Sequence, residues 1–257
     1  MGVSYEMNTD ESCLILTVLA DSKIKYFYCD MASPQSIHET AQAVRDQFGH
    51  PSILVNNAGI ATLSPILDKS DEYTEKLFKV NILSHFTLIR EYMPDMMKKN
   101  KGHIVGISSM ASFATPPGIV DYAATKAAVL ALHEGWCILG SVLFTFLTSS
   151  PGLNQEIKHV YRTPGVLNTI VHPGWVRTNI VKGFEDLLEK TQGKLMNPEI
   201  VGKTIVDQII SCRGGQLIIP KKLSMGTGIR GLPNWLQEII RDQAFSKTPL
   251  KYSGPTK

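Results

Sequence analysis

Two residues in the run VDYAATKAAV (120–129), Tyr122 and Lys126, stand four positions apart in an alanine-rich segment that favours a helix. Residues at this spacing are neighbours on one helix face, one turn apart. A free phenol has a pKa of about 10, and an adjacent cation favours its phenolate form. The pair could therefore exchange a proton with a ligand. Taken in isolation, the same spacing also fits an ordinary helix whose Lys stem lies along apolar surface with its ammonium in water.

The elements around this helix alternate between strand-like and helical patterns from residue 23 onward. Ser33 with Pro34 is typical of a helix start, and Gly49 of its end. Ser70 predicts the start of a long helix through Met97, and Asn197 with Pro198 the start of another. Apolar runs predict strands at 23–31, 51–59, 102–109, 166–175 and 215–220. Strands separated by helices predict an α/β domain whose parallel sheet is covered on both faces.

The ligand of such a sheet lies beyond the carboxyl ends of the strands, so the residues that follow each strand are candidates. Asn56, Asn57, Ala58 and Gly59 form a small turn that a flat ligand could approach closely. Two further groups follow later strands, Ser108-Ser109 and the run PGWVRT (173–178).

In order and spacing, these motifs resemble the short-chain dehydrogenase/reductase family over residues 23–220: NNAG (56–59), Asn81 in the next helix, Ser109 thirteen residues before Tyr122, and PGWVRT. The flanking text, including LVNNAGI, IVGISSMAS and LPNWLQE, resembles the retinol dehydrogenase and 17β-hydroxysteroid dehydrogenase branch, and its fungal members in particular. The resemblance implies a Rossmann-like, doubly wound parallel sheet in a single domain spanning residues 1–257.

The resemblance also implies roles in hydride transfer between an alcohol carbon and a nicotinamide, a reaction in which a proton joins or leaves the oxygen. Tyr122 would be the acid/base, and Lys126 would favour its phenolate and hold the nicotinamide ribose. Ser109 would donate to the substrate oxygen as charge develops, and Asn81 would stabilise the site and a water-linked proton path. The implied cofactor is NADP or NAD, with NADP slightly preferred.

The cofactor-binding residues implied by the resemblance fall into three groups. Asp30 would contact adenine; the residues beside the adenosine half would be Asn57, Ala58 and Gly59; those at the carboxamide would be Pro173, Gly174, Val176 and Thr178. Alternatives remain: Asn81 could bond only to backbone, Asp30 could be an acid flanking the helix near Ser33, and Ser108 has a structural role. No chemistry is assigned to His172 or Arg177.

Two features depart from the family pattern. Between Gly2 and Gly49 there is no glycine, and only 22 residues precede the strand at Lys23, whereas a βαβ unit takes roughly 30. We therefore expect an N-terminally truncated sheet with an atypical segment at 1–22, no pyrophosphate cradle and weakened cofactor binding. The apolar run 13–20 could take the place of a strand.

The second departure is the uncharged segment 136–152, which resembles an insertion. With these 17 residues removed, Leu153, Ile157 and Val160 continue the apolar stripe that ends at Leu132. Translation of a retained intron, with an equally altered start, would explain both departures. An apolar lip over the substrate, or a loop that dips into a membrane, is the functional alternative.

Composition narrows the possible partners. A formal net charge of +3 gives no argument for nucleic acid, and four scattered cysteines with no CxxC spacing or paired histidines indicate a reduced, intracellular chain without a metal site. The expected location is the cytoplasm or the surface of the endoplasmic reticulum or of lipid droplets.

The extension 221–257 carries an amphipathic helix, LPNWLQEIIRDQ (232–243), whose apolar side would pack in the core or in a homo-oligomer, or lie on a membrane surface.

Two functions are compatible with the sequence. The first is an oxidoreductase that acts on a small hydrophobic alcohol or ketone, such as a retinoid, a steroid or another lipid. The second is a non-catalytic protein that keeps the helices of the fold but cannot bind a dinucleotide.

Overall fold

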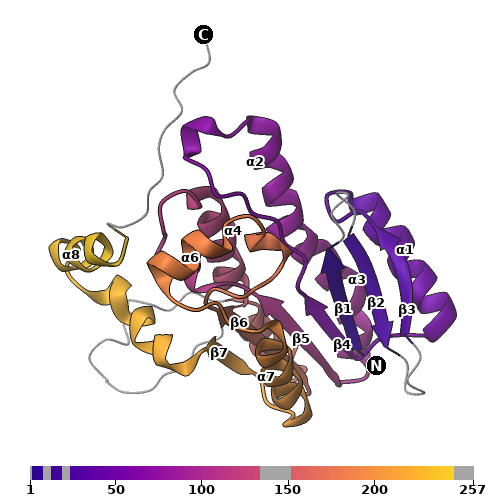
Figure 1. Cartoon of the computed structure of the whole chain (residues 1–257). Coiled ribbons are helices and arrows are strands. Elements are labelled where there is room, and N and C mark those ends of the chain that lie inside the picture. The colour runs from indigo at the N-terminus through magenta and orange to yellow at the C-terminus, as the bar shows by residue number, and fades with distance from the viewer. Residues whose placement is uncertain (1, 8–12, 19–23, 134–151, 246–257) are drawn as a thin grey trace.

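The computed structural model describes residues 2–7, 13–18, 24–133 and 152–245 (Figure 1). Its strands are β1 (Gly2–Met7), β2 (Cys13–Val18), β3 (Ile24–Cys29), β4 (Ile53–Asn56), β5 (Gly102–Ile107), β6 (Val166–Pro173) and β7 (Gly215–Ile219). Its α-helices are α1 (Pro34–Phe48), α2 (Asp71–Phe78), α3 (Ser84–Lys98), α4 (Val120–His133), α5 (Leu153–Gln155), α6 (Glu185–Gln192), α7 (Pro198–Ile210) and α8 (Asn234–Phe245).

Shorter helical segments join these elements. The 3-10 segments are η1 (Ile66–Asp68), η3 (Met110–Ser112), η5 (Asn179–Val181) and η6 (Lys221–Gly231). The π-helical segments are η2 (Lys79–Leu83) and η4 (Glu156–Val160). Because η2 joins α2 directly to α3, these three elements form one helical stretch from residue 71 to residue 98.

Four strands form a parallel sheet in the order β4-β5-β6-β7, which confirms the predicted parallel α/β architecture. The strand predicted at 23–31 belongs to a different sheet, in which β1, β2 and β3 pair antiparallel. The predicted parallel pairing of this strand is therefore wrong, because its neighbour is β2. The run 13–20 does supply a strand, as predicted, and β1 lies beside β4 without forming a ladder with it (Figure 1).

Helix boundaries follow from local hydrogen bonds that the sequence predicts. The Ser33 hydroxyl accepts from Ser36 N at the start of α1, and the Ser70 hydroxyl accepts from Tyr73 N at the start of α2. The Asn197 side chain accepts from Glu199 N at the start of α7. Each side chain satisfies a backbone N–H that has no partner within its helix.

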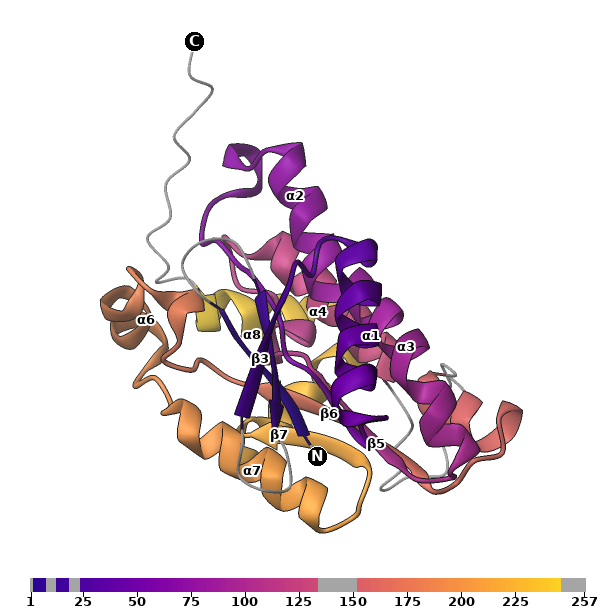
Figure 2. The same cartoon turned by 90° about the vertical axis from the view of Figure 1, so that its right-hand side faces the viewer.

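Helices cover both faces of the parallel sheet, and alternate residues of one strand serve the two sides. Ile104 packs in the cluster formed with α1 and α3, whereas Val105 packs in the cluster that includes Val201 of α7. Figure 2 shows α7 on one side of the sheet and α1 and α3 on the other. This alternation is the two-residue period of a strand buried on both faces, and it confirms the predicted doubly wound layering.

The predicted insertion at 136–152 lies almost entirely outside the described residues. On its far side, Leu153 and Ile157 are buried in the same cluster against which Leu132 packs, as the interrupted stripe predicts. Val160, the third residue of the stripe, is 67% exposed, so that part of the prediction is wrong. Val160 is the last residue of the π-helical segment η4, where the chain leaves the core.

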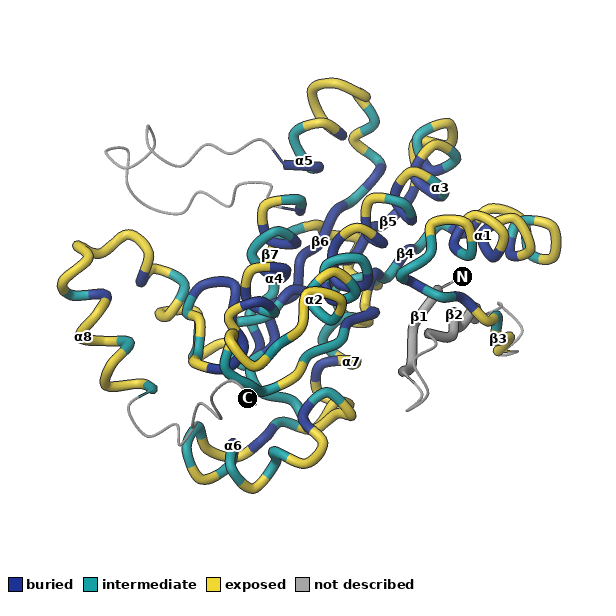
Figure 3. Tube along the Cα trace, turned by 90° about the horizontal axis from the view of Figure 1, so that it is seen from above, coloured by how far each residue is buried: buried dark blue, intermediate teal, exposed yellow. Residues whose placement is uncertain are grey.

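The prediction that the apolar side of α8 packs in the core is also wrong. Trp235 and Ile239 are 63% and 47% exposed, and Figure 3 shows most of α8 at the surface. Its packing in an oligomer and its membrane-surface role stay predictions. No helix in the described part of the chain is long and apolar enough to cross a membrane.

Candidate active site

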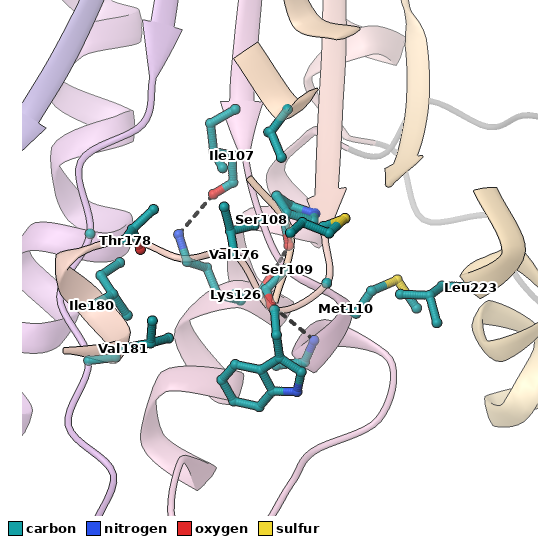
Figure 4. A pocket seen from close by; sticks show the side chains of 18 of the residues that line it. Ile107, Ser108, Ser109, Met110, Lys126, Val176, Thr178, Ile180, Val181 and Leu223 are labelled. Atoms are coloured by element: carbon teal, nitrogen blue, oxygen red, sulfur yellow. Dashed lines mark hydrogen bonds between the residues drawn. The ribbon is translucent and has the colours of Figure 1, made fainter. Parts of the chain in front are cut away.

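A cavity of about 1340 Å³ opens at the carboxyl ends of the parallel strands (Figure 4). All the site residues predicted from the sequence, except Asn81 and Asp30, line it: Asn57, Ala58, Gly59, Ser109, Tyr122, Lys126, Pro173, Gly174, Val176 and Thr178. They come from segments after β4, β5 and β6 and from α4. The parallel sheet brings these segments to one edge, so the predicted convergence is observed.

Tyr122 occupies the first turn of α4 and faces the residues that follow β5. Its phenol forms a side-chain hydrogen bond with Ser109, which lowers its pKa, but burial outweighs this bond and raises the pKa to about 12. Leu63, Ile119 and Trp175 pack in one apolar cluster with the tyrosine ring. Tyr122 therefore carries its proton at neutral pH.

Lys126 lies one turn further along α4 and is 2% exposed. Its ammonium donates to the Ile107 carbonyl at 2.8 Å, at the end of β5 (Figure 4). It also lies 5.6 Å from the Tyr122 ring centroid. Burial lowers the pKa of Lys126 to about 8. The Ser108 hydroxyl donates to the Lys126 carbonyl at 2.8 Å, in keeping with the structural role predicted for Ser108.

The expectation that Lys126 lowers the pKa of Tyr122 is wrong for this arrangement. Burial penalises the charged form of each group, so it favours the neutral phenol as well as the neutral amine. The sequence shows that the two residues are neighbours but does not show how much water reaches them. On a helix face exposed to solvent this burial cost would be absent, and the attraction between the ammonium and the phenolate would lower the pKa of the phenol.

Asn81 lies behind the cavity wall, in the π-helical segment η2. Its side-chain oxygen accepts from Ile60 N at 2.8 Å, and its nitrogen donates to Ile60 O at 3.0 Å and to the Thr125 hydroxyl at 3.1 Å. The amide thus joins the turn after β4 to α4. A Cβ at Gly59 would lie 3.5 Å from the Asn81 oxygen and 3.4 Å from the Lys126 nitrogen, so the three residues meet closely.

Asp30 is the predicted site residue that the fold places elsewhere. Its carboxylate accepts from Ala32 N at 2.8 Å and its carbonyl accepts from Ser33 N at 3.1 Å, at the start of α1. It does not line the cavity. This is the geometry of the alternative interpretation, an acid that flanks a helix start.

Trp175, inside the run PGWVRT, and His172, directly before it, gain a place in the site that the sequence analysis did not assign to them. Trp175 lines the cavity and packs with Tyr122. His172 is fully buried, with Nδ1 3.3 Å from the Ser109 carbonyl and Nε2 3.1 Å from the Gln216 amide nitrogen. Burial lowers the pKa of His172 to about 4, so the ring supports the Ser109 turn as a neutral group. Their position inside the strand-end run 166–175 was the available signal.

The residues of this cavity fit one half of a nicotinamide dinucleotide. The Lys126 ammonium has three N–H groups and gives one to Ile107 O, so donors remain for ribose hydroxyls. With Tyr122 and Thr178, it would hold the nicotinamide ribose half. The pyrophosphate half has no matching cradle among the described residues: the start of α1 is already capped by Ser33, and no glycine turn precedes it in the ranges 2–7, 13–18 and 24–33.

No group of three or more His, Cys, Asp or Glu side chains within the described ranges is placed to hold a metal ion. The polar side chains that line the cavity carry hydroxyl, phenol, amide, ammonium and guanidinium groups.

Comparison with known proteins agrees with the motif pattern. Dehydrogenase RED3 of Cochliobolus heterostrophus is 44% identical over 110 residues, which are 43% of this chain and 56% of the relative. Human estradiol 17-beta-dehydrogenase 11 is 28% identical over 221 residues, 86% of this chain and 66% of the relative. Retinol dehydrogenase 10-B of Danio rerio is 30% identical over 165 residues, 64% of this chain and 44% of the relative. The chain thus spans roughly half to two thirds of the length of these curated relatives.

Solved structures share the fold at low sequence identity. 4-Hydroxyisoleucine dehydrogenase complexed with NADH aligns with a TM-score of 0.57 and 22% identity, over 74% of this chain and 76% of that chain.

The family model described as short chain dehydrogenase matches residues 5–137, just over half of the chain. The fold, the order of the motifs and this match together place the chain in the short-chain dehydrogenase family.

Proposed function

We propose that the protein is an NAD(P)-dependent oxidoreductase that interconverts a hydrophobic alcohol and the corresponding carbonyl compound, a ketone from a secondary alcohol or an aldehyde from a primary one, with Tyr122 as the acid/base. The observation that carries this proposal is the convergence of the Ser109 hydroxyl, the Tyr122 phenol and the Lys126 ammonium on one cavity. A bound nicotinamide would supply or accept the hydride. The chain itself has to move a proton at the same oxygen.

Tyr122 and Ser109 can perform that proton chemistry together. Because burial raises the pKa of Tyr122 to about 12, the phenol is a proton donor at neutral pH. A carbonyl oxygen beside it would receive this proton, and the Ser109 hydroxyl would donate a hydrogen bond to the same oxygen as negative charge develops. The site is thus suited to the reductive direction near pH 7.

The substrate is proposed to be apolar because most of the cavity wall is. Leu63 and Ile119 lie beside Tyr122, and the cavity continues along Phe184, Leu188 and Ile205 towards α8. A ligand that buries several of these side chains gains about 25 cal/mol for each Å² of apolar surface removed from water. The names of two relatives, which refer to estradiol and retinol, support a steroid, a retinoid or another lipid as the class.

The cofactor is proposed as NADP or NAD, held through Tyr122, Lys126, Asn57–Gly59 and the turn Pro173–Thr178. The test is a titration of the purified protein with NADPH and with NADH, followed by nicotinamide fluorescence, and then turnover assays with steroid and retinoid ketones or aldehydes. Tyr122→Phe removes the proton donor and keeps the ring, so it should abolish turnover, while NADPH binding stays detectable by fluorescence because Lys126 and the other cofactor-binding residues remain. Turnover that survives this substitution would refute the role of Tyr122.

A second candidate is a non-catalytic member of the family, and the missing match for the pyrophosphate among the described residues favours it. Each lost charge-assisted hydrogen bond weakens binding by about 1.5 to 3 kcal/mol, so several together reduce affinity by orders of magnitude. No fluorescence change at millimolar NADPH or NADH would support this candidate and contradict the enzyme.

A further inference from the structure

We infer that Lys69 and Asp121 form a buried ion pair that positions Tyr122 and the adjoining cavity wall, an inference whose catalytic part rests on the proposed function. The two residues are 52 positions apart; Asp121 directly precedes Tyr122 in the run VDYAATKAAV, and the sequence analysis assigned a role to neither residue. Lys69 Nζ lies 2.5 Å from Asp121 Oδ1, and each side chain is 4% exposed. We call this pair and its backbone contacts the wall clamp.

The Lys69 ammonium uses its three N–H groups on three different acceptors. Besides Asp121, it donates to the Thr62 carbonyl at 3.0 Å and to the Gly118 carbonyl at 3.3 Å. It also lies 5.8 Å from the ring centroid of Tyr73, a distance suited to a cation–π contact. Because an ammonium has three donors, this set satisfies it completely and ties the segment after β4 to the segment before α4.

Asp121 connects the same ammonium to the proposed acid/base. The carboxylate oxygen that receives Lys69 also accepts from the backbone N–H of Tyr122 at 2.8 Å, in the first turn of α4. The other oxygen is buried without a hydrogen-bond partner among the described residues. The position of the Tyr122 backbone thus depends on a carboxylate that Lys69 holds in place.

The segments joined by the wall clamp form the apolar wall next to Tyr122. Ser64 N donates to the Gly118 carbonyl at 3.0 Å, so this carbonyl serves both segments. Leu63 and Ile119, one from each segment, line the cavity and pack with the Tyr122 ring. Gly118 has φ +83°, a conformation that glycine adopts without strain, and this turn presents its carbonyl to Lys69.

Both charges are withdrawn from water, which determines how the wall clamp can be tested. Removal of one partner leaves an uncompensated buried charge and endangers the fold, whereas apolar residues in place of both leave none. The informative variant is therefore the double substitution Lys69→Met/Asp121→Leu, studied beside Lys69→Met and Asp121→Asn. Lys203→Met is the matched control, because Lys203 pairs with Asp207 at an exposed site where the two side chains are 76% and 60% exposed.

The first measurement is amide hydrogen exchange, which needs no activity. In the double variant, exchange should increase at least tenfold in residues 61–69 and 116–122 and stay unchanged in α1 (34–48), while the melting temperature remains within a few degrees of that of the parent. Lys203→Met should change neither segment. Unchanged exchange in both segments, or a uniform increase throughout the protein, would overturn the inference.

The second measurement separates positioning of Tyr122 from a purely structural role. The double variant should lose 10- to 100-fold in kcat for a hydrophobic ketone, while its Kd for NADPH stays within threefold, because small displacements of a reacting group cost rate rather than cofactor affinity. An unchanged kcat would refute the positioning of Tyr122. If the parent protein lacks turnover, the proposed function fails, and hydrogen exchange alone decides whether the wall clamp exists.

Discussion

The Lys126 ammonium lies 5.6 Å from the Tyr122 ring centroid, and burial moves the two pKa values apart, down to about 8 for the amine and up to about 12 for the phenol. The Lys126 amine is still protonated at pH 7, so its buried positive charge is unfavourable for folding. Lys126 is 2% exposed, and the Ile107 carbonyl is the acceptor that its ammonium contacts.

Lys126→Met should stabilise the fold at pH 7. The folded-state pKa is below the ordinary value of 10.5, so the ionised side chain opposes folding at pH values below about 8, and this cost disappears as the pH rises towards 10.5. After allowance for the lost hydrogen bond to Ile107, we expect a gain of about 1 to 3 kcal/mol in the free energy of unfolding.

Urea unfolding at pH 7 and at pH 10 measures this gain, which should shrink at the higher pH. A loss of stability at pH 7 would contradict the desolvation argument. The same variant should lose turnover, because it has no ammonium for a ribose.

Ser109→Ala should lower kcat of the reductive reaction by about 100- to 1000-fold, the usual effect of removing one donor to a developing oxyanion. The substitution also removes the oxygen that accepts from Ala111 N at 3.1 Å, so the melting temperature must be recorded alongside. Ser211→Ala, at an exposed hydroxyl on the end of α7, is the matched control and should leave kcat unchanged.

Acid should destabilise the protein through its buried histidines. His133 and His172 are almost fully buried, and burial lowers both pKa values from 6.5 to about 4. The unfolded chain therefore binds protons first, and the free energy of unfolding should fall as the pH drops from 6.5 to 4, by up to about 3 kcal/mol for each histidine.

Urea unfolding at pH 7.0, 5.5 and 4.5 tests this dependence. His172→Gln should reduce the slope between pH 6.5 and 4, whereas the exposed control His159→Gln separates burial from the mere loss of a histidine. Equal slopes for the parent and His172→Gln would refute the assignment.

Gly106→Ala should destabilise the fold because the new Cβ would overlap the ring of His133. Overpacking of this kind costs about 1 to 3 kcal/mol. Gly202→Ala is the matched control, since nothing lies within 4 Å of a Cβ at this exposed position in α7. It should raise the free energy of unfolding by about 0.5 to 1 kcal/mol, because alanine favours a helix over glycine. Thermal unfolding of both variants decides the point; a neutral Gly106→Ala would show that His133 can move aside.

Much of the fold and most of the site could be predicted from the sequence, because their causes are local. Ser33, Ser70 and Asn197 begin helices through hydrogen bonds to residues two or three positions away. The period of apolar residues identifies the strands of a parallel sheet, and the geometry of such a sheet brings the ends of β4, β5 and β6 together. Tyr122, Lys126 and Ser109 were therefore expected at one edge, and they line one cavity.

The tertiary structure alone decided the features that depend on distant partners or on the exclusion of water. The pairing of β3 with β2, the placement of Asp30 outside the cavity and the exposure of Trp235 result from which surfaces meet. Lys69 pairs with Asp121, 52 positions away along the chain, and nothing in the sequence around Lys69 predicts this partner. The high pKa of Tyr122 has the same origin: the sequence determines which charges are neighbours, but packing determines the water around them, and here burial outweighs proximity.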